Sequence, residues 1–403
     1  MQTRIAPPFA DSAAGQDAEA ILRRCVHCGF CLATCPTYQL TGNELDSPRG
    51  RIYLIKQLLE GQPVGAQTRH HLDRCLTCRA CETTCPSGVD YHRLADIGRH
   101  WLEAQQPRPL AERFRRGLLK RLLRNRPLFA GTVALGRLAR PLLPGLTASL
   151  PARGNTRRPA AAEGLERWLI LEGCVQPSLA PSINAAAARV LAACGIALEP
   201  VRGCCGAVAW HLNDAERGRA DMRRLVEACA AGLDRGAAGI VSSASGCGAT
   251  VADYGKLLAD EPCAHSAQRV AAGTRDLAEL VSERLDRLLP RLAPPAEPRL
   301  AFHAPCSLQH GLRRRPLVER MLERLGYVLL PVADSHLCCG SAGTYSILQP
   351  ALARQLRNDK LAKLEAGQPP AIATANIGCQ THLQAGTDTP VRHWIELVAE
   401  RLR

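Results

Sequence analysis

Two short stretches of the sequence each place four cysteines at close, regular spacing. They read CVHCGFCLATCP at 25–36 and CLTCRACETTCP at 75–86, with three cysteines in C-x2-C-x2-C order and a fourth before a proline. This layout is typical of 4Fe–4S clusters, and in two-cluster ferredoxins the fourth cysteine binds the neighbouring cluster. We therefore predict two 4Fe–4S clusters, one held by Cys25, Cys28, Cys31 and Cys85 and the other by Cys75, Cys78, Cys81 and Cys35.

Zinc and disulfides are the alternatives for these cysteines. Zinc sites usually use two C-x2–4-C pairs separated by a longer loop, which this spacing fits poorly. Disulfides are typical of small secreted domains, whereas this chain has 403 residues and an odd count of 19 cysteines. The first twenty residues do not resemble a signal peptide, and no apolar run is long enough to span a membrane. The composition therefore indicates reduced metal ligands in a cytoplasmic protein.

The C-terminal half repeats a second cysteine pattern. Cysteine pairs separated by 132, 134 and 132 residues align LILEGCVQP with LAFHAPCSL, RGCCGAVAW with HLCCGSAGT, and GIVSSASGCGAT with AIATANIGCQTH. One interpretation is a further metal–sulfur or thiol redox centre, and the alternative is a set of buried, inert thiols. The candidate ligands are Cys174, Cys204, Cys205 and Cys247 in the first repeat and Cys306, Cys338, Cys339 and Cys379 in the second.

Other residues near these motifs have open interpretations. His382 follows Cys379 at the metal-like C-x2-H spacing, although single histidines are more often structural. Cys194, Cys229 and Cys263 belong to no motif, and we expect them to be small core residues. His27, Arg74 and Arg79 lie within or beside the cluster loops, where they tune cluster potentials, are solvated or have a structural role.

These motifs belong to different structural zones, giving an α plus α/β fold class. In the first zone, Ser47 is a predicted N-cap, with Pro48 opening a helix that Gly61 terminates. Alternating apolar and Ala/Leu-rich stretches after about residue 165 indicate parallel strands with helices. We expect a helical two-cluster ferredoxin domain at 1–110, a basic helical linker at 111–163, and two duplicated α/β Cys-Cys-Gly domains at 164–292 and 293–403.

Most of the formal net charge of +14 comes from one segment. Twelve Lys or Arg residues lie between Arg113 and Arg158, and no acidic residue occurs between Glu112 and Glu163. The segment is a solvated linker or a surface that docks an acidic partner or anionic lipid. Nucleic acid is disfavoured because only Phe114 and Phe129 are available there to stack on bases.

Beyond the cysteines, several longer stretches resemble one family. DSPRGRIYLIKQLLEG, HLDRCLTC, CETTCPSGV, DSHLCCGSAGTY and TANIGCQTHL are similar to the glycolate oxidase iron–sulfur subunits, among the iron–sulfur subunits of membrane-associated 2-hydroxy-acid and glycerol-phosphate dehydrogenases. Heterodisulfide-reductase-like proteins have a fifth cysteine where this chain has Thr250 in one repeat and His382 in the other. A five-cysteine site is therefore unavailable in either repeat.

The resemblance implies an electron-transfer subunit. It implies a separate flavoprotein subunit, holding FAD, that oxidises glycolate to glyoxylate, a third flavin-domain-like subunit, and electron delivery to a respiratory-chain acceptor. It also implies a peripheral position at the cytoplasmic face of the inner membrane. The sequence itself shows no dinucleotide-binding fingerprint, and 2-hydroxy-acid oxidation needs a two-electron cofactor. We therefore expect no catalytic residue on this chain.

Two other functions remain open from sequence. The first keeps the oxidoreductase class but changes the donor, as in a D-lactate or glycerol-3-phosphate dehydrogenase subunit or a heterodisulfide-reductase-like protein. The second is a scaffold with structural metals that binds nucleic acid through the basic segment. Iron and a paramagnetic signal on reduction would exclude the scaffold, whereas zinc and salt-sensitive DNA binding would favour it.

Overall fold

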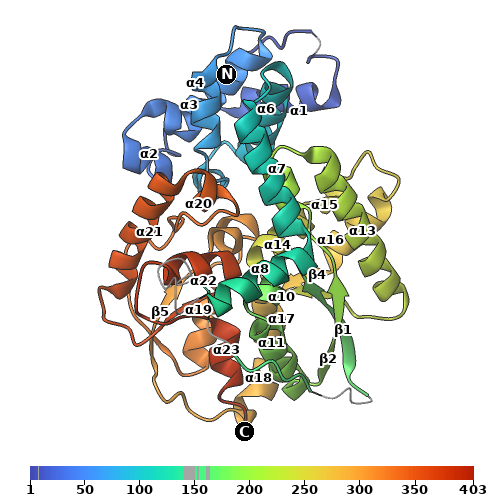
Figure 1. Ribbon diagram of the computed structural model, residues 1–403, viewed down its shortest axis with the longest axis vertical. Coiled ribbons are helices and arrows are strands. Elements are labelled where there is room, and N and C mark those ends of the chain that lie inside the picture. Colours follow the sequence, from blue (N-terminus) through green and yellow to red (C-terminus); the bar gives the residue numbers. More distant parts are fainter. Residues whose placement is uncertain (8, 140–149, 152–153, 160–163) are drawn as a thin grey trace. The chain divides into compact units, whose positions relative to one another are not determined.

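The computed structural model describes residues 1–7, 9–139, 150–151, 154–159 and 164–403 (Figure 1). The chain divides into two compact units, each assembled from separate stretches of sequence. Residues 1–117 and 336–356 form the N-terminal unit, and residues 118–335 and 357–403 form the C-terminal unit. The expected linker at 111–163 lies partly outside the described residues.

The N-terminal unit is built from helices, as the sequence predicts. Among the described residues its helices are α1 (Ala13–Arg24), α2 (Pro36–Thr41), α3 (Pro48–Leu59), α4 (Ala66–Asp73), α5 (Ala80–Thr84), α6 (Tyr91–Gln105), the first part of α7 (Leu110–Arg124), α20 (Tyr345–Leu348) and the start of α21 (Pro350–Glu365). Its core lies between α1, α3 and α6 and contains Leu22, Ile55 and Leu94.

Helix α3 shows why this part of the chain folds locally as it does. The Ser47 hydroxyl accepts a hydrogen bond from the Gly50 N–H, and Pro48 occupies the first turn, where no N–H is needed. Gly61 follows the helix with φ +77°, a conformation that suits glycine. The predicted start and end of the helix are confirmed, as is its buried face of Ile52, Ile55, Leu58 and Leu59.

The C-terminal unit contains two small parallel sheets with the same strand order. The first sheet runs β2-β1-β3-β4 and the second β6-β5-β7-β8, so the internal repeat is also a structural one. The strands are β1 (Glu166–Glu172), β2 (Ile196–Arg202), β3 (Ile240–Ser242), β4 (Thr274–Asp276), β5 (Arg299–His303), β6 (Val328–Leu329), β7 (Ile372–Thr374) and β8 (Val391–His393). The predicted fold class is confirmed.

Helices cover these sheets and close a core that both repeats share. Ile170 and Val241 of the first sheet belong to the same buried cluster as Phe302, Ala373 and Trp394 of the second repeat. The helices are the rest of α7 and α21, together with α8 (Arg126–Leu138), α10 (Gln176–Leu179), α11 (Ser182–Ala193), α12 (Ala207–His211), α13 (Ala215–Asp234), α14 (Ser245–Ala252), α15 (Tyr254–Leu257), α16 (Ala264–Gly273), α17 (Leu277–Glu283), α18 (Leu285–Leu288), α19 (Leu317–Arg324), α22 (Ile377–Gln384) and α23 (Trp394–Ala399).

Candidate metal centres

The first cysteine motif lies in a loop between α1 and α2 that curls around a hollow. His27 and Gly29 have φ values of +56° and +88°, which turn the backbone sharply between the cysteines. The hollow encloses about 430 Å³ of empty space, including open solvent. Its lining includes the four thiols predicted for the first cluster, Cys25, Cys28, Cys31 and Cys85, and also Cys81.

The second motif surrounds a similar hollow of about 370 Å³. Thr77 and Arg79 have positive φ values of +52° and +63°, so this loop turns at the places equivalent to those in the first motif. Pro36 begins α2, which directs the chain away directly after Cys35. The lining includes the four thiols predicted for the second cluster, Cys35, Cys75, Cys78 and Cys81.

Each hollow therefore receives a thiol from the other motif. Cys85 of the second motif lines the first hollow, and Cys35 of the first motif lines the second. Among the described residues, no three of these eight thiols lie mutually within 4.8 Å. A single zinc ion needs thiolates at about 2.3 Å from the metal, so this wider arrangement fits a cluster better.

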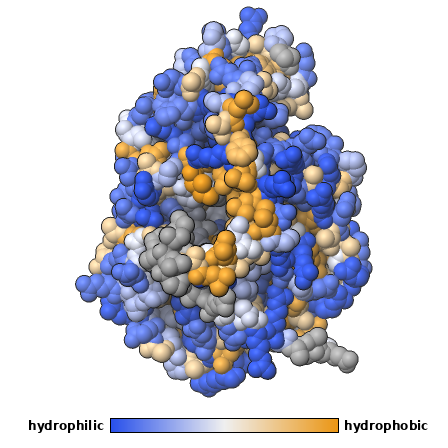
Figure 2. All heavy atoms as spheres, in the orientation of Figure 1, coloured by the Kyte–Doolittle hydropathy of each residue, from blue (hydrophilic) through white to orange (hydrophobic). Residues whose placement is uncertain are grey.

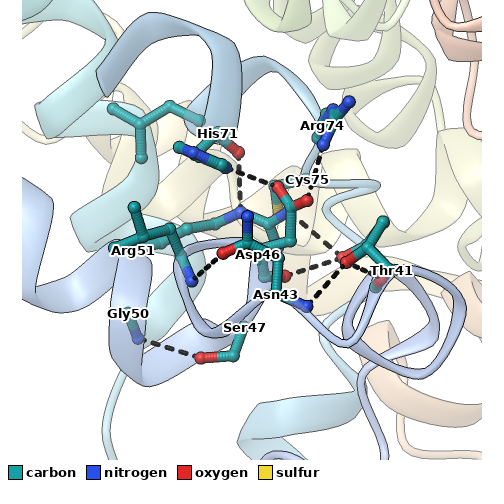
Figure 3. Close-up of polar contacts among 12 residues, drawn as sticks. Thr41, Asn43, Asp46, Ser47, Gly50, Arg51, His71, Arg74 and Cys75 are labelled. Carbon is teal, nitrogen blue, oxygen red and sulfur yellow. Dashed lines mark hydrogen bonds and ion pairs between the residues drawn. The ribbon is translucent and has the colours of Figure 1, made fainter. Parts of the chain in front are cut away.

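A buried polar network stands beside the second hollow (Figure 3). Asp46 is fully buried, and its carboxylate accepts hydrogen bonds from Arg74 at 2.7 Å and contacts His71 Nδ1 at 2.9 Å. Arg51 is only 1% exposed and lies 3.5 Å from the same carboxylate. Its guanidinium donates to the His71 carbonyl at 2.8 Å and to Thr37 Oγ1 at 3.1 Å. These contacts fix the Arg51 charge in the protein interior.

Cys75 lies within the influence of this network. Its sulfur accepts hydrogen bonds from the Thr77 N–H at 3.4 Å and the Tyr91 hydroxyl at 3.5 Å. Burial opposes ionisation of this thiol, but the charges of Arg51 and Arg99 and these hydrogen bonds hold its pKa below the ordinary value. Arg99 is 8% exposed and donates only to backbone carbonyls in the hydrogen bonds described, including that of Cys75 at 2.9 Å.

The first hollow has a different electrostatic environment. Burial raises the pKa of Cys25, and it raises that of Cys31 to about 11. The nearby Arg49 guanidinium is partly exposed and is paired with Glu44 at 2.6 Å, so its charge is largely neutralised. The Met1 ammonium donates to the Cys25 carbonyl at 2.6 Å. The rim is open and apolar, since the side chain of Phe30 is 62% exposed.

The first repeat of the C-terminal unit brings its four motif cysteines together. Cys174 follows β1, Cys204 and Cys205 follow β2, and Cys247 lies in α14 after β3. The Cys204 and Cys174 sulfurs are 3.7 Å apart. Cys205 lies within hydrogen-bonding reach of both Cys204 and Cys247, so the thiols form a continuous chain. Hydrogen bonding to Cys204 and burial raise the pKa of Cys174.

The four motif cysteines of the second repeat are divided between the two compact units. Cys306 and Cys379 belong to the C-terminal unit, whereas Cys338 and Cys339 belong to the N-terminal unit. The motif glycines share one conformation, with φ +82° at Gly206 and +89° at Gly340. An added Cβ would lie 2.7 Å from the Gly218 carbonyl oxygen or the Ala353 carbonyl oxygen, respectively. Each glycine therefore permits a close helix contact and a left-handed backbone.

Within the N-terminal unit, the segment 336–356 contributes a buried tyrosine. Tyr345 is 7% exposed, and its hydroxyl has no hydrogen-bond partner among the described residues. Burial raises its pKa, and the ring lies within electrostatic reach of Arg51, Cys75 and Cys338. One Cys-Cys-Gly motif thus folds with the two hollows.

The cysteines outside the motifs lie in or against the hydrophobic core. Cys194 and Cys229 are buried in the core, and Cys263 packs against it, as predicted. Sequence reasoning missed Arg51 and Arg99 entirely. Arg51 precedes Leu54 and Ile55 by three and four residues, a spacing that assigns it to the buried face of α3.

Comparisons with known proteins agree with the two cysteine patterns. A 4Fe-4S dicluster domain model matches residues 21–89, and a cysteine-rich domain model matches residues 168–252 and 300–384. The glycolate oxidase iron–sulfur subunit of Escherichia coli (strain K12) is 50% identical, covering 100% of this chain and 99% of that protein. The probable glycolate oxidase iron–sulfur subunit of Bacillus subtilis (strain 168) is 28% identical over 92% of this chain and 90% of its own length. Lactate utilization protein A of Geobacillus kaustophilus is 24% identical over 52% of this chain and 87% of its own length.

Proposed function

The chain belongs to the glycolate oxidase iron–sulfur subunit family, and from this premise we propose how its residues serve electron transfer. The protein is an iron–sulfur electron-transfer subunit of this oxidoreductase. Oxidation of glycolate to glyoxylate releases two electrons and two protons, whereas a 4Fe–4S cluster accepts single electrons. A flavoprotein subunit therefore oxidises the substrate, and this chain passes the electrons on toward a respiratory-chain acceptor.

The two thiol-lined hollows are the observation that supports this role. Their linings favour a cross-linked ligand set in which each motif supplies three thiolates to its own cluster and one to its neighbour. When bound, each cluster supplies a one-electron redox site. The protein contributes the thiolates and leaves the rim of the first site, where Phe30 is exposed, open to a partner. The proposed ligand sets are Cys25, Cys28, Cys31 and Cys85 for one cluster and Cys75, Cys78, Cys81 and Cys35 for the other.

Separate cysteine changes in the assembled complex test this assignment. Cys28→Ser and Cys78→Ser each remove one ligand from one proposed set, and Cys263→Ser is the matched control because it belongs to neither set. We expect about eight irons and eight sulfides per chain for two clusters in the wild type and the control. Each ligand variant should lose one paramagnetic signal and the reduction of a dye that takes electrons only from the clusters. Unchanged iron and dye reduction in both ligand variants would refute the assignment.

The first-repeat thiols are proposed as a further metal–sulfur or thiol redox centre. Three adjacent strands deliver Cys174, Cys204, Cys205 and Cys247 to one end of a parallel sheet, where ligand sites usually form. More than eight irons per chain would support an additional iron–sulfur centre there. Loss of that excess in Cys204→Ser, with both N-terminal signals retained, would assign it to this repeat.

The electron donor has a second candidate. This second candidate is D-lactate, because lactate utilization protein A matches about half of this chain at low identity. Glycerol 3-phosphate is the third donor to be tested. The full-length match to a glycolate oxidase subunit favours glycolate. Each candidate donor is added to the complete complex, and the loss of visible iron–sulfur absorbance is measured. The donor that reduces the clusters is the one that causes this loss.

Some cations of the basic segment are paired within the protein. In α7, Arg116 is buried and pairs with Glu112 at 3.0 Å, while Lys120 and Arg124 bind Asp214 and Asp221 at 2.6 Å. The expected outward-facing charges of this helix therefore partly hold it to the protein. No helix in the described part of the chain has the length and apolar character needed to cross a membrane.

The exposed face of α7 carries a row of apolar side chains between basic ones. Leu110, Phe114 and Leu118 recur every four residues and are 78%, 75% and 56% exposed. Figure 2 shows apolar surface along α7 and, separately, along α8. Exposed Arg113 and Arg121 flank the apolar row of α7. An apolar helix face beside cations suits an anionic lipid surface, so we infer peripheral docking of α7 at the cytoplasmic face of the inner membrane.

A further inference from the structure

Two apolar side chains of the first cysteine motif are exposed beside the first hollow. Val26 and Phe30 line this hollow and are 67% and 62% exposed. The second motif has the same cysteine spacing, but the residues at the equivalent positions, Leu76 and Ala80, are only 3% and 1% exposed. Both loops turn through positive φ values at two equivalent places. The same kind of loop therefore has its apolar positions buried in one motif and open to solvent in the other.

Basic side chains stand next to this apolar pair. Arg23 and Arg24 end α1 directly before the motif, and both are exposed. Cys28, one of the proposed ligands, is exposed between Val26 and Phe30. Protein interfaces commonly combine an apolar centre that contains aromatic residues with a polar, charged rim. The rim of the first hollow therefore has the composition of a docking surface, and the arginines favour a partner with acidic groups opposite them.

Buried cations lie at the second hollow. Arg51 lines it, and Arg99 donates to the Cys75 carbonyl at 2.9 Å. These two arginines are 1% and 8% exposed. Together with Arg74 they exceed the carboxylate of Asp46, which contacts Arg51 and Arg74, by two charges. Fixed positive charge at this site favours the state that carries an added electron.

The first hollow has less fixed positive charge. Arg49 lines it, but this arginine is paired with Glu44 at 2.6 Å. The ammonium of Met1, a half-buried residue, donates to the Cys25 carbonyl at 2.6 Å and adds one charge. A docked partner removes water from the open rim, so water no longer stabilises negative charge there. The second site therefore has the higher reduction potential, and electrons move from the first site to the second.

We propose that Val26 and Phe30 form the docking surface for the flavoprotein subunit, and that electrons enter this chain at the first site. The partner that delivers electrons belongs beside the site of lower potential, so the occupant of this rim is the electron donor and not the acceptor. Each glycolate supplies two electrons, which cross this surface singly. The two protons stay on the flavoprotein side, because this chain transfers electrons alone. The inference rests on the proposed function, since it requires both clusters and a flavoprotein that oxidises the substrate.

Replacement of the apolar pair tests the docking surface. Val26→Asp with Phe30→Asp, in the full-length chain with both clusters, should raise the dissociation constant for the flavoprotein subunit at least tenfold. Phe114→Asp is the matched control, because Phe114 is 75% exposed and lines neither hollow, and its affinity should be unchanged. Both paramagnetic signals should persist, since no ligand is altered. Unchanged affinity in the double variant, or a loss confined to self-association of this chain, would overturn the proposal.

Ligand variants in the assembled complex test the direction of electron flow. In Cys28→Ser, glycolate should reduce the second site at least tenfold more slowly than in the wild type, although a chemical reductant still reduces it. In Cys78→Ser, glycolate should reduce the first site at the wild-type rate. Undiminished reduction of the second site in Cys28→Ser would overturn the proposed entry point.

A milder variant keeps the test decisive if Cys28→Ser fails to fold. Phe30→Ala should slow the reduction of both sites by glycolate but not by a chemical reductant, and a wild-type rate with glycolate would overturn the proposal. Absence of both paramagnetic signals from the wild-type chain would refute the proposed clusters. The affinity for the flavoprotein subunit, measured separately, would still decide whether Val26 and Phe30 form its docking surface.

Discussion

Replacing Arg51 by Met should lower the reduction potential of the second cluster. Arg51 is buried beside Cys75, and its charge stabilises negative charge at that thiol. Each added electron makes a cluster more negative, so a fixed neighbouring cation favours the reduced form. Substitution by Met removes the charge and retains much of the side chain's apolar stem.

The local charges set the expected size of this shift. Arg51 and Arg74 contact the Asp46 carboxylate, whereas Arg99 donates to the Leu72 and Cys75 carbonyls, so these three cations exceed that one carboxylate by two charges. At an effective dielectric constant of about 20, a unit charge roughly 8 Å from the added electron contributes about 2 kcal/mol. A tenfold change is about 1.4 kcal/mol and 59 mV for one electron, so the predicted decrease is about 90 mV.

Redox titration monitored by electron paramagnetic resonance measures this shift. Arg51→Lys keeps the charge and should change the potential by less than about 30 mV, whereas Arg51→Met should lower one of the two potentials by about 90 mV. Arg49→Met is the control at the first site, because its cation is partly exposed and already paired with Glu44. Both Arg51 variants lose thermal stability, since each disturbs a buried network. Equal shifts in Arg51→Met and Arg51→Lys, or no shift with both clusters present, would refute the reasoning.

Three further changes test other parts of the structure. Phe114→Asp with Leu118→Asp should reduce flotation with anionic vesicles at least tenfold without lowering the melting temperature, because both side chains are exposed; unchanged flotation would contradict membrane docking by α7. Burial raises the pKa of Asp276 to about 7 in the folded protein. As the pH rises from about 4 to 7, the carboxyl group ionises in the unfolded chain but stays protonated in the folded one, so the free energy of unfolding decreases. Asp276→Asn keeps an N-cap acceptor and should flatten this decrease in urea titrations, while an unaltered pH profile would show that Asp276 is not its source. Gly206→Ala should destabilise the protein by about 2 kcal/mol or more, since φ is +82° and its Cβ would lie 2.7 Å from a carbonyl oxygen; Gly42→Ala, with φ +62° and open space, should lose only about 1 kcal/mol.

Local signals in the sequence predicted the elements that depend on local chemistry. Ser47 and Pro48 mark the start of α3 because capping and a fixed φ act within one turn. The repeated cysteine offsets likewise predicted two equivalent α/β repeats, which the matching strand orders confirm. Such features require only neighbouring residues or a duplicated pattern.

Long-range pairing was the part that sequence could not supply. Arg51 receives its buried position through Thr37, Asp46 and the His71 carbonyl, which are 14, 5 and 20 residues away. The α7 cations similarly find carboxylates more than 90 residues later, at Asp214 and Asp221. A run of basic residues gives no indication of such distant partners, so the sequence could not tell which α7 cations are paired within the protein and which, such as Arg113 and Arg121, stay exposed.

The interrupted N-terminal unit has a consequence for biosynthesis. Its eight cluster-motif cysteines leave the ribosome early, but the unit also requires the segment 336–356. During synthesis of the intervening chain, this unit remains incomplete and lacks the buried Tyr345 ring near Cys75. Release of a truncated chain ending before residue 336 would leave the unit permanently open.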